Sequence, residues 1–158
     1  MGKALVVVHS WHHGNTEKIA GAIAGALDAE VKFPQDIRPE DSGEYSLIGL
    51  GAGIDSGRHY APLLDWAGAL PPAQEQSAFI FSTAGVSSKK KTARDHSALR
   101  EILLAKGYAI VGEFACRGYN TNSVLKHMGG MNRGRPNEDD LQAAADFAHA
   151  LAGGQADG

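Results

Sequence analysis

The chain has 158 residues, of which 43% are hydrophobic, and this length fits one domain with a substantial core. Fifteen basic and 18 acidic residues give a formal net charge of −3, so the sequence predicts no general attraction to nucleic acid or to a membrane surface. No apolar run approaches the roughly 18 residues that span a bilayer, and the N-terminus lacks the pattern of a secretory signal. With a single cysteine, Cys116, an internal disulfide is excluded, and we expect a cytoplasmic protein.

Apolar runs and helically spaced apolar residues alternate along the chain in a regular order. Continuous apolar runs are typical of parallel strands that are covered on both faces, and stripes with a period near 3.6 residues indicate helices. The expected strands are 4–9, 30–33, 46–51, 77–81 and 109–115, and the expected helices are 14–27, 60–70, 92 or 93 to 106, and 137–151. The segment 34–43 has no clear period and is expected to be a loop or a broken helix.

Three helix ends carry recognisable signals. Pro71 and Pro72 end the second helix because proline cannot continue it. Gly107 suits the left-handed conformation that follows many helices. Asn137 before three acidic residues predicts an N-cap with a favourable first turn. Residues 153–158 are expected to form a flexible tail.

This alternation predicts an open parallel sheet with helices on both faces. In such sheets, ligands bind beyond the carboxyl ends of the strands. The loops that the pattern brings to that edge are 10–16, 52–59, 82–91 and 116–136.

The first of these loops is suited to an anion. The strand that ends near His9 is followed within a few residues by a helix, and the first amides of a helix have no partner within it. Gly14 lets the backbone approach closely, and Asn15 and Thr16 offer side-chain donors. The sequence therefore predicts a phosphate-binding turn.

Three segments together resemble the flavodoxin family, whose members bind FMN. The turn WHHGNTEKIA resembles the family's phosphate loop, LIGLGAGIDSGRHYAPLLDWAGAL resembles its second flavin loop and following helix, and AFIFSTAG resembles its third strand-end loop. The resemblance implies a three-layer α/β/α sandwich over residues 1–152, with a five-stranded parallel sheet in the order 2-1-3-4-5.

The resemblance also implies a set of cofactor-binding residues, with no catalytic side chain and no metal ligand. Residues of the first loop would hold the phosphate, and residues of the second and third would lie along the flavin ring, with one aromatic residue after the last strand. The residues are Ser10, Trp11, His12, His13, Gly14, Asn15, Thr16, Gly53, Ile54, Asp55, Ser56, Gly57, His59, Ser82, Thr83, Ala84, Gly85 and Tyr119.

The chain departs from the family pattern in its phosphate loop and in its aromatic residues. Histidines occupy positions 12 and 13, where family members usually place hydroxyl residues. Because a phosphate dianion favours the imidazolium form, we hypothesise that FMN affinity weakens as pH rises through the histidine range. The candidates for stacking on the flavin are few, namely Trp11, His59, Tyr60 and Tyr119; Tyr60 also suits packing at a helix start.

A third departure is the positive charge near the predicted site. Basic residues cluster after the third loop and in the last loop, where 118–136 is long enough to act as a lid or to mediate self-association. These residues are Lys89, Lys90, Lys91, Arg94, Arg117, Lys126, Arg133 and Arg135. They are compatible with simple solvation, and they also predict an anionic partner, either a redox protein or NAD(P)H.

Two functions remain open from the sequence, besides a domain that has lost its flavin and serves only in protein interaction. The first is an electron carrier in which FMN shuttles one or two electrons between redox partners. The second is an FMN-dependent NAD(P)H oxidoreductase acting on a quinone or another small acceptor. The histidines suggest no metal site, since no carboxylate or thiolate joins them at ligand spacing. We expect no nucleic acid or membrane partner, and a monomer or a homodimer.

Overall fold

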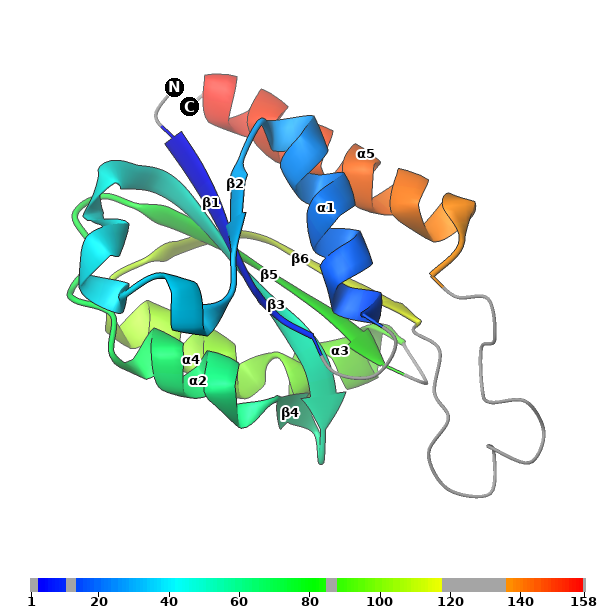
Figure 1. Cartoon of the computed structure of the whole chain (residues 1–158), viewed down its shortest axis with the longest axis horizontal. Helices are drawn as coiled ribbons and strands as arrows, with labels where there is room; N and C mark the ends of the chain where they lie inside the picture. Colours follow the sequence, from blue (N-terminus) through cyan, green and yellow to red (C-terminus); the bar gives the residue numbers. More distant parts are fainter. Residues whose placement is uncertain (1–2, 11–13, 85–87, 118–135, 158) are drawn as a thin grey trace.

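The structure is a computed structural model and describes residues 3–10, 14–84, 88–117 and 136–157, without the side chains of Arg117 and of 154–157. Strands and helices alternate along most of the chain, as the sequence predicts (Figure 1). The strands are β1 (Lys3–His9), β2 (Glu30–Lys32), β3 (Tyr45–Asp55), β4 (Arg58–His59), β5 (Ser77–Ala84) and β6 (Ala109–Arg117). The helices are α1 (Asn15–Leu27), α2 (Ala61–Gly68), α3 (Lys89–Asp95), α4 (Ser97–Ala105) and α5 (Glu138–Asp157), with short 3₁₀ turns η1 (Pro34–Asp36) and η2 (Pro39–Glu44).

Five of these strands form the parallel sheet that the sequence predicts, in the order β2-β1-β3-β5-β6. This is the expected 2-1-3-4-5 order, because β4 is a two-residue strand that pairs only with β3, in the antiparallel sense. The strand order therefore reverses between β1 and β3, at the carboxyl edge where ligands bind in such sheets.

Two layers of helices cover the sheet, with α1 and α5 on one face and α2 and α4 on the other (Figure 1). Alternation along β1 divides its side chains between the layers. Leu5 and Val7 belong to the core that contains Leu63 and Leu99, whereas Val6 and Val8 belong to the core on the α1 and α5 face. Both cores are buried, so the sheet is fixed from either side.

Glycines in β3 make room for the aromatic rings of β5. A Cβ atom at Gly49 would lie 2.0 Å from the ring of Phe79, and one at Gly51 would lie 2.1 Å from the ring of Phe81. The two rings are also stacked on each other, with centroids 6.1 Å apart. The strands that lead to the predicted site are therefore held by close packing.

The structure corrects two sequence predictions. The helix expected over 92 or 93 to 106 is two helices, α3 and α4, with a break at His96, a residue whose side chain is fully buried. The third and fourth predicted strands extend further at their carboxyl ends, to Asp55 and Ala84. The hairpin that β3 makes with β4 has no counterpart in the sequence prediction.

Other predictions are confirmed. Gly107 has a φ of 92° after α4. The Asn137 Oδ1 atom accepts from the amide of Asp140 at 3.0 Å, and Asp140 Oδ2 accepts from the amide of Asn137 at 2.8 Å, which is a reciprocal cap of α5. The helix α5 extends to Asp157. The expected flexibility of residues 153–158 stays a prediction. Among the described helices, none combines the length and apolar character needed to cross a membrane.

Candidate cofactor site

The carboxyl ends of four neighbouring strands lie side by side in register. His9 of β1 pairs with Ala52 of β3, Ala52 pairs with Ser82 of β5, and Ser82 pairs with Ala115 of β6. This row brings together the first, second and third loops of the sequence prediction. The residues that follow it therefore face the same edge of the sheet.

The start of α1 lies at this edge with its amides directed outward. Gly14 adopts the left-handed conformation, with φ 64° and ψ 28°, and no side chain of the described residues caps the helix. The first intrahelical bond runs from the amide of Lys18 to the carbonyl of Gly14, at 3.1 Å. Ser10 Oγ, just before the turn, is buried and has no hydrogen-bond partner within the described chain. An anion at the helix start would meet the first amides of α1.

A hydroxyl pair connects the helix start to the third loop. Thr16 Oγ1 and Thr83 Oγ1 lie 2.7 Å apart, and the two side chains are 1% and 5% exposed. The bond joins α1 to the end of β5 across the α1 and α5 face of the sheet. It fixes the distance between the predicted phosphate turn and one predicted flavin loop.

The second loop is a tight hairpin rather than an open loop. Ser56 and Gly57, between β3 and β4, have φ values of 55° and 81°, so both central residues of the turn are left-handed. This turn places Asp55 opposite Arg58 and Ile54 opposite His59. The backbone of the hairpin therefore projects as a short ribbon at the site edge.

The ring of Tyr60 lies over Gly53, where a Cβ atom would be only 2.6 Å from Tyr60 Cε2. Its amide donates to the carbonyl of Gly53 at 3.2 Å, and the ring meets His9 edge-on, with centroids 5.8 Å apart. Burial lowers the pKa of His9, which favours its neutral form. Both predicted roles of Tyr60, packing at a helix start and stacking on the flavin, stay open, since it lies directly before α2 and at the strand ends.

His59, a predicted cofactor residue, turns into the protein. Its side chain is 1% exposed, and its Nε2 atom lies 3.0 Å from the carbonyl oxygen of Phe81. Its Nδ1 atom is buried without a hydrogen-bond partner in the part of the chain that the structure describes. Burial, with a further contribution from nearby His96, lowers the pKa of His59 to about 4.

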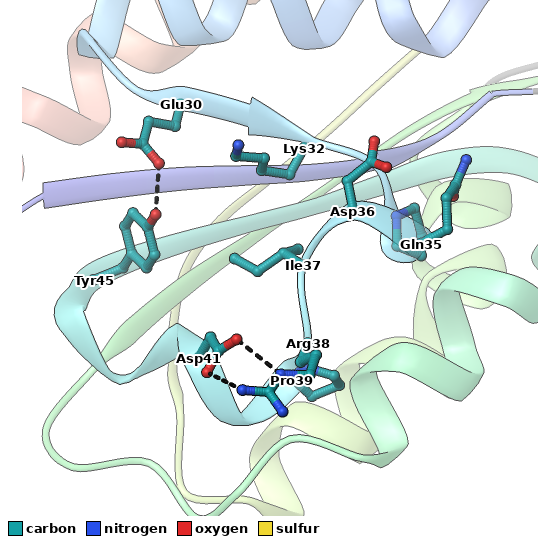
Figure 2. Close-up of a pocket in the computed structure, with 10 residues that line it drawn as sticks. Glu30, Lys32, Gln35, Asp36, Ile37, Arg38, Pro39, Asp41 and Tyr45 are labelled. Atoms are coloured by element: carbon teal, nitrogen blue, oxygen red, sulfur yellow. Dashed lines mark hydrogen bonds and ion pairs between the residues drawn. The ribbon is translucent and has the colours of Figure 1, made fainter.

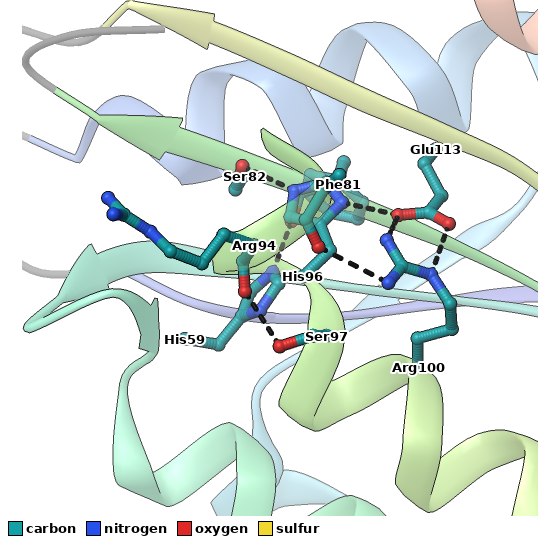
Figure 3. A network of polar contacts seen from close by, with 9 residues as sticks. His59, Phe81, Ser82, Arg94, His96, Ser97, Arg100 and Glu113 are labelled. Carbon is teal, nitrogen blue, oxygen red and sulfur yellow. Dashed lines mark hydrogen bonds and ion pairs between the residues drawn. The ribbon is translucent and has the colours of Figure 1, made fainter. Parts of the chain in front are cut away.

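Ser82, another predicted cofactor residue, also faces inward and joins a polar network (Figure 3). Its Oγ atom lies 2.7 Å from Nε2 of His96, and Nδ1 of His96 lies 2.8 Å from Oε1 of Glu113. Arg100 completes the network with two bonds to the same carboxylate, of 2.7 and 2.6 Å. We call Ser82, His96, Glu113 and Arg100 the β5–β6 polar network.

The charges of this network are set by its surroundings. Although burial alone would raise the pKa of Glu113, its bonds to Arg100 and His96 lower it below the usual value. Burial lowers the pKa of His96 despite the contact with Glu113. The network at neutral pH therefore combines an ionised carboxylate and guanidinium with a neutral imidazole.

Positive charge is also present beside the third loop, on α3. Lys91 is paired with the buried carboxylate of Asp95, whereas Lys89 and Lys90 are exposed and Arg94 has a side-chain exposure of 71%. Three exposed cations therefore lie on the helix that follows β5. This arrangement agrees with the basic cluster noted in the sequence.

Two pockets lie beside the sheet, one away from the carboxyl ends of the strands and one beside the end of β6 at Ala115. One, of about 580 Å³, is bordered by β2 and the 3₁₀ turns (Figure 2). In this pocket Arg38 bonds Asp41, and the hydroxyl of Tyr45 donates to Glu30 at 2.5 Å. The other pocket, of about 490 Å³, is bordered by α3 and β6 and reaches Arg100 and Glu113. Neither contains a predicted cofactor residue.

Several predicted residues lie outside the described residues, and their part in the site stays a prediction. They are Trp11, His12, His13, Gly85, Tyr119, Lys126, Arg133 and Arg135, together with the side chain of Arg117. Within the described ranges, no group of three or more His, Cys, Asp and Glu side chains is placed to hold a metal ion.

Sequence reasoning missed the partners of Ser82, namely His96, Glu113 and Arg100. Two signals were available. His96 stands three residues before Leu99 and seven before Leu103, so it lies on the apolar stripe of its helix. Glu113 is a charge inside an apolar strand.

Comparisons with known proteins agree with this geometry. A family model described as a flavodoxin domain matches residues 6–152. A curated protein of Methanocaldococcus jannaschii, described as uncharacterized, is 41% identical over 149 residues, which are 94% of this chain and 97% of that protein.

Solved structures of flavodoxins share the fold. Oxidised Flavodoxin 2 from Bacillus cereus is 19% identical, with a TM-score of 0.72 over 95% of this chain and 97% of its own. Rubredoxin oxygen:oxidoreductase from Desulfovibrio gigas is 16% identical, with a TM-score of 0.63 over 97% of this chain and 37% of its own. The same fold thus occurs alone and within a larger protein.

Proposed function

The chain belongs to the flavodoxin-domain family, and we propose that it binds FMN at the carboxyl ends of β1, β3 and β5 and carries electrons between redox partners. The observation that carries this proposal is the start of α1. There, amides without a side-chain cap among the described residues and a left-handed Gly14 lie at the switch point of the sheet, and the buried hydroxyl of Ser10, four residues before Gly14, has no partner in that part of the chain. These groups fit a phosphate.

The flavin ring would lie against the second and third loops. Backbone at Gly53–Asp55 and at Ser82–Ala84 forms the carboxyl ends of the adjacent strands β3 and β5, so both segments would border one planar ligand. Tyr60 and His9 offer aromatic surface beside Gly53. Because Thr16 and Thr83 bond each other, the phosphate end and the ring end would be held at a fixed separation.

Bound FMN would supply the redox chemistry, so no catalytic side chain is required. The chain's own residues would bind the phosphate, orient the ring and set the polarity around it. In this role the domain needs only a partner that delivers electrons and one that removes them.

The test is a comparison of FMN with riboflavin, which lacks the phosphate. Apoprotein titrated with each flavin should bind FMN at least about tenfold more tightly, because only FMN reaches the amides of α1. Flavin fluorescence and absorbance report the binding. Equal affinities would show that the turn before α1 does not bind the phosphate. If neither flavin binds, the proposed function is overturned.

The exposed cations of α3 favour a second candidate, an FMN-dependent NAD(P)H oxidoreductase. Lys89, Lys90 and Arg94 lie next to the third loop and would attract the phosphates of a nicotinamide nucleotide. NADH or NADPH mixed anaerobically with the FMN-loaded protein should then bleach the flavin absorbance rapidly. A carrier would stay oxidised until a reductase is added. Replacing the three cations by Gln should slow the bleaching in the first case.

A further inference from the structure

The least expected feature of this domain is a pair of buried imidazoles under the strand ends. The rings of His59 and His96 have centroids 5.0 Å apart, and the side chains are 1% and 0% exposed. They come from β4 and from the junction between α3 and α4. The proposed electron carrier needs neither of them to hold FMN.

Hydrogen bonds fix which nitrogen of each ring carries the proton. The carbonyl of Phe81 can only accept, so His59 donates from Nε2 and its neutral ring has a free electron pair on Nδ1. Ionised Glu113 can only accept, so His96 donates from Nδ1. The electron pair on Nε2 of His96 therefore accepts the hydroxyl hydrogen of Ser82.

Charged groups surround the pair on several elements, and they compensate each other. Glu113 of β6 is neutralised by Arg100 of α4, and Asp95 of α3 is neutralised by Lys91 of the same helix. The guanidinium of Arg94 is a further 3.9 Å from Asp95 but is largely exposed. With both imidazoles neutral, this buried region has little net charge, so a charge added nearby is poorly compensated.

The pair is joined to the proposed flavin site through Ser82. This residue directly precedes Thr83 in β5, and Thr83 bonds the start of α1. His59 ends the hairpin that begins at Gly53, and β4 lies against α3 and α4. The imidazoles therefore lie directly beneath both loops that would border the flavin ring.

We propose that His96 takes up a proton from solvent when a flavin at the strand ends accepts an electron from its redox partner, so that the added charge is compensated inside the domain. This inference rests on the proposed function. The electron goes to the flavin and the proton goes to Nε2 of His96, with no other bond made or broken. The hydrogen bond to Ser82 then reverses, because Nε2 becomes the donor and the Ser82 hydroxyl rotates to accept, keeping its own hydrogen.

The contacts select His96 rather than His59 as the proton acceptor. An imidazolium at His96 would keep a carboxylate at 2.8 Å from its Nδ1 atom. His59 has only a carbonyl contact, and a second positive ring 5.0 Å away opposes its protonation. Glu113 and Arg100 border the pocket of about 490 Å³, so the carboxylate side of the network is open to solvent.

The experiment follows the histidine ring carbons by NMR in the FMN-loaded protein, oxidised and then fully reduced with dithionite. At pH values from about 5 to 9, ¹³Cε1 shifts report imidazole protonation. The apparent pKa of His96 should rise by at least about one unit on reduction, a tenfold gain in proton affinity. An unchanged His96 titration overturns the inference.

Variants assign the signals and supply a second readout. His96→Gln removes the His96 signal, and the variant should take up fewer protons on full reduction near neutral pH than the parent protein or His149→Gln, with a maximum difference of about half a proton for a one-unit rise. Equal proton uptake overturns the inference. If His96→Gln does not fold, Glu113→Gln serves as the variant, because losing the carboxylate should reduce the rise in the apparent pKa of His96.

Absorbance first establishes whether FMN binds. A protein that stays colourless overturns the proposed function as well, whereas bound FMN with an unchanged His96 titration overturns the inference alone.

Discussion

The end of β5 presents two neighbouring hydroxyls to two different environments. Thr83 faces α1 and bonds Thr16, in a contact with no ionisable group. Ser82 faces α3 and α4 and bonds His96, which leads to Glu113 and Arg100. Thr83 therefore connects the site to a neutral layer, and the neighbouring Ser82 connects it to a layer with titratable groups.

This difference shows how one strand can separate two tasks. Because successive side chains point to opposite faces, a single step along β5 changes the partner from a helix start to a charged network. We infer that the α1 face holds the cofactor by geometry, while the α4 face adjusts the electrostatics. The predictions below act on one face and use the other as reference.

The largest expected effect is the loss of stability in acid on the α4 face. The pKa of His59 falls from 6.5 to about 4 on folding, so the unfolded chain binds the proton first as pH decreases. Between about pH 6.5 and 4, the free energy of unfolding should fall by about 3 kcal/mol through this residue alone. Urea unfolding of the apoprotein at several pH values measures it.

The control for this acid effect is the exposed histidine of α5. His59→Gln should flatten the dependence of the unfolding free energy on pH, and His149→Gln should leave it as in the parent. If the unfolding free energy of His59→Gln depends on pH as steeply as that of the parent, the buried imidazole of His59 is not the source of the acid effect, contrary to our account.

A smaller effect is expected from removing the carboxylate that serves both Arg100 and His96. Glu113→Gln keeps the shape but loses charge-assisted hydrogen bonds, and should reduce the unfolding free energy by about 2 kcal/mol at pH 7. Glu101→Gln, on exposed α4 surface, should change it by less than about 0.5 kcal/mol. Similar losses in the two variants would mean that the network contributes no specific stability.

On the α1 face, the hydroxyl pair should contribute less. Thr83→Val leaves the buried hydroxyl of Thr16 without this partner and should cost about 1.5 kcal/mol. The double variant with Thr16→Val should cost less than the sum of the two single changes, because neither hydroxyl is then left unpaired. If the losses of unfolding free energy in chemical denaturation are additive, the bond between Thr16 and Thr83 does not contribute to stability.

The smallest effect compares two glycines with open space around them. A Cβ atom meets nothing within 4 Å at Gly14 or at Gly25, but only Gly14 has a left-handed φ, of 64°. Gly14→Ala should destabilise the apoprotein by about 1 kcal/mol, whereas Gly25→Ala within α1 should stabilise it by about 0.5 to 1 kcal/mol. Melting temperatures that move in the same direction would contradict the assigned conformation of the phosphate turn.

The fold could be predicted because its signals are local. Continuous apolar runs indicated the first, third and fourth of the predicted parallel strands, and caps such as Asn137 placed helix ends. The hairpin at Ser56 and Gly57 was missed because β4, with two residues, is too short to show a strand pattern. The break at His96 was missed because the helical spacing continues through it.

The candidate site could be predicted only in part. The turn at Gly14 has a sequence signature, since a strand leads directly into a helix start. The roles of Ser82 and His59 were not visible, because their partners are 14 and 22 residues distant and lie on other elements. A charge inside an apolar strand, as at Glu113, indicates from the sequence alone that a polar network is present, but it does not identify the partners.

The most direct test of the account is a titration of FMN into apoprotein at pH 7, followed by flavin fluorescence. We predict saturation at one FMN per chain, with a dissociation constant of about 1 µM or lower. A linear response with no saturation at far higher FMN concentrations would contradict the claim that the carboxyl ends of β1, β3 and β5 form a flavin site.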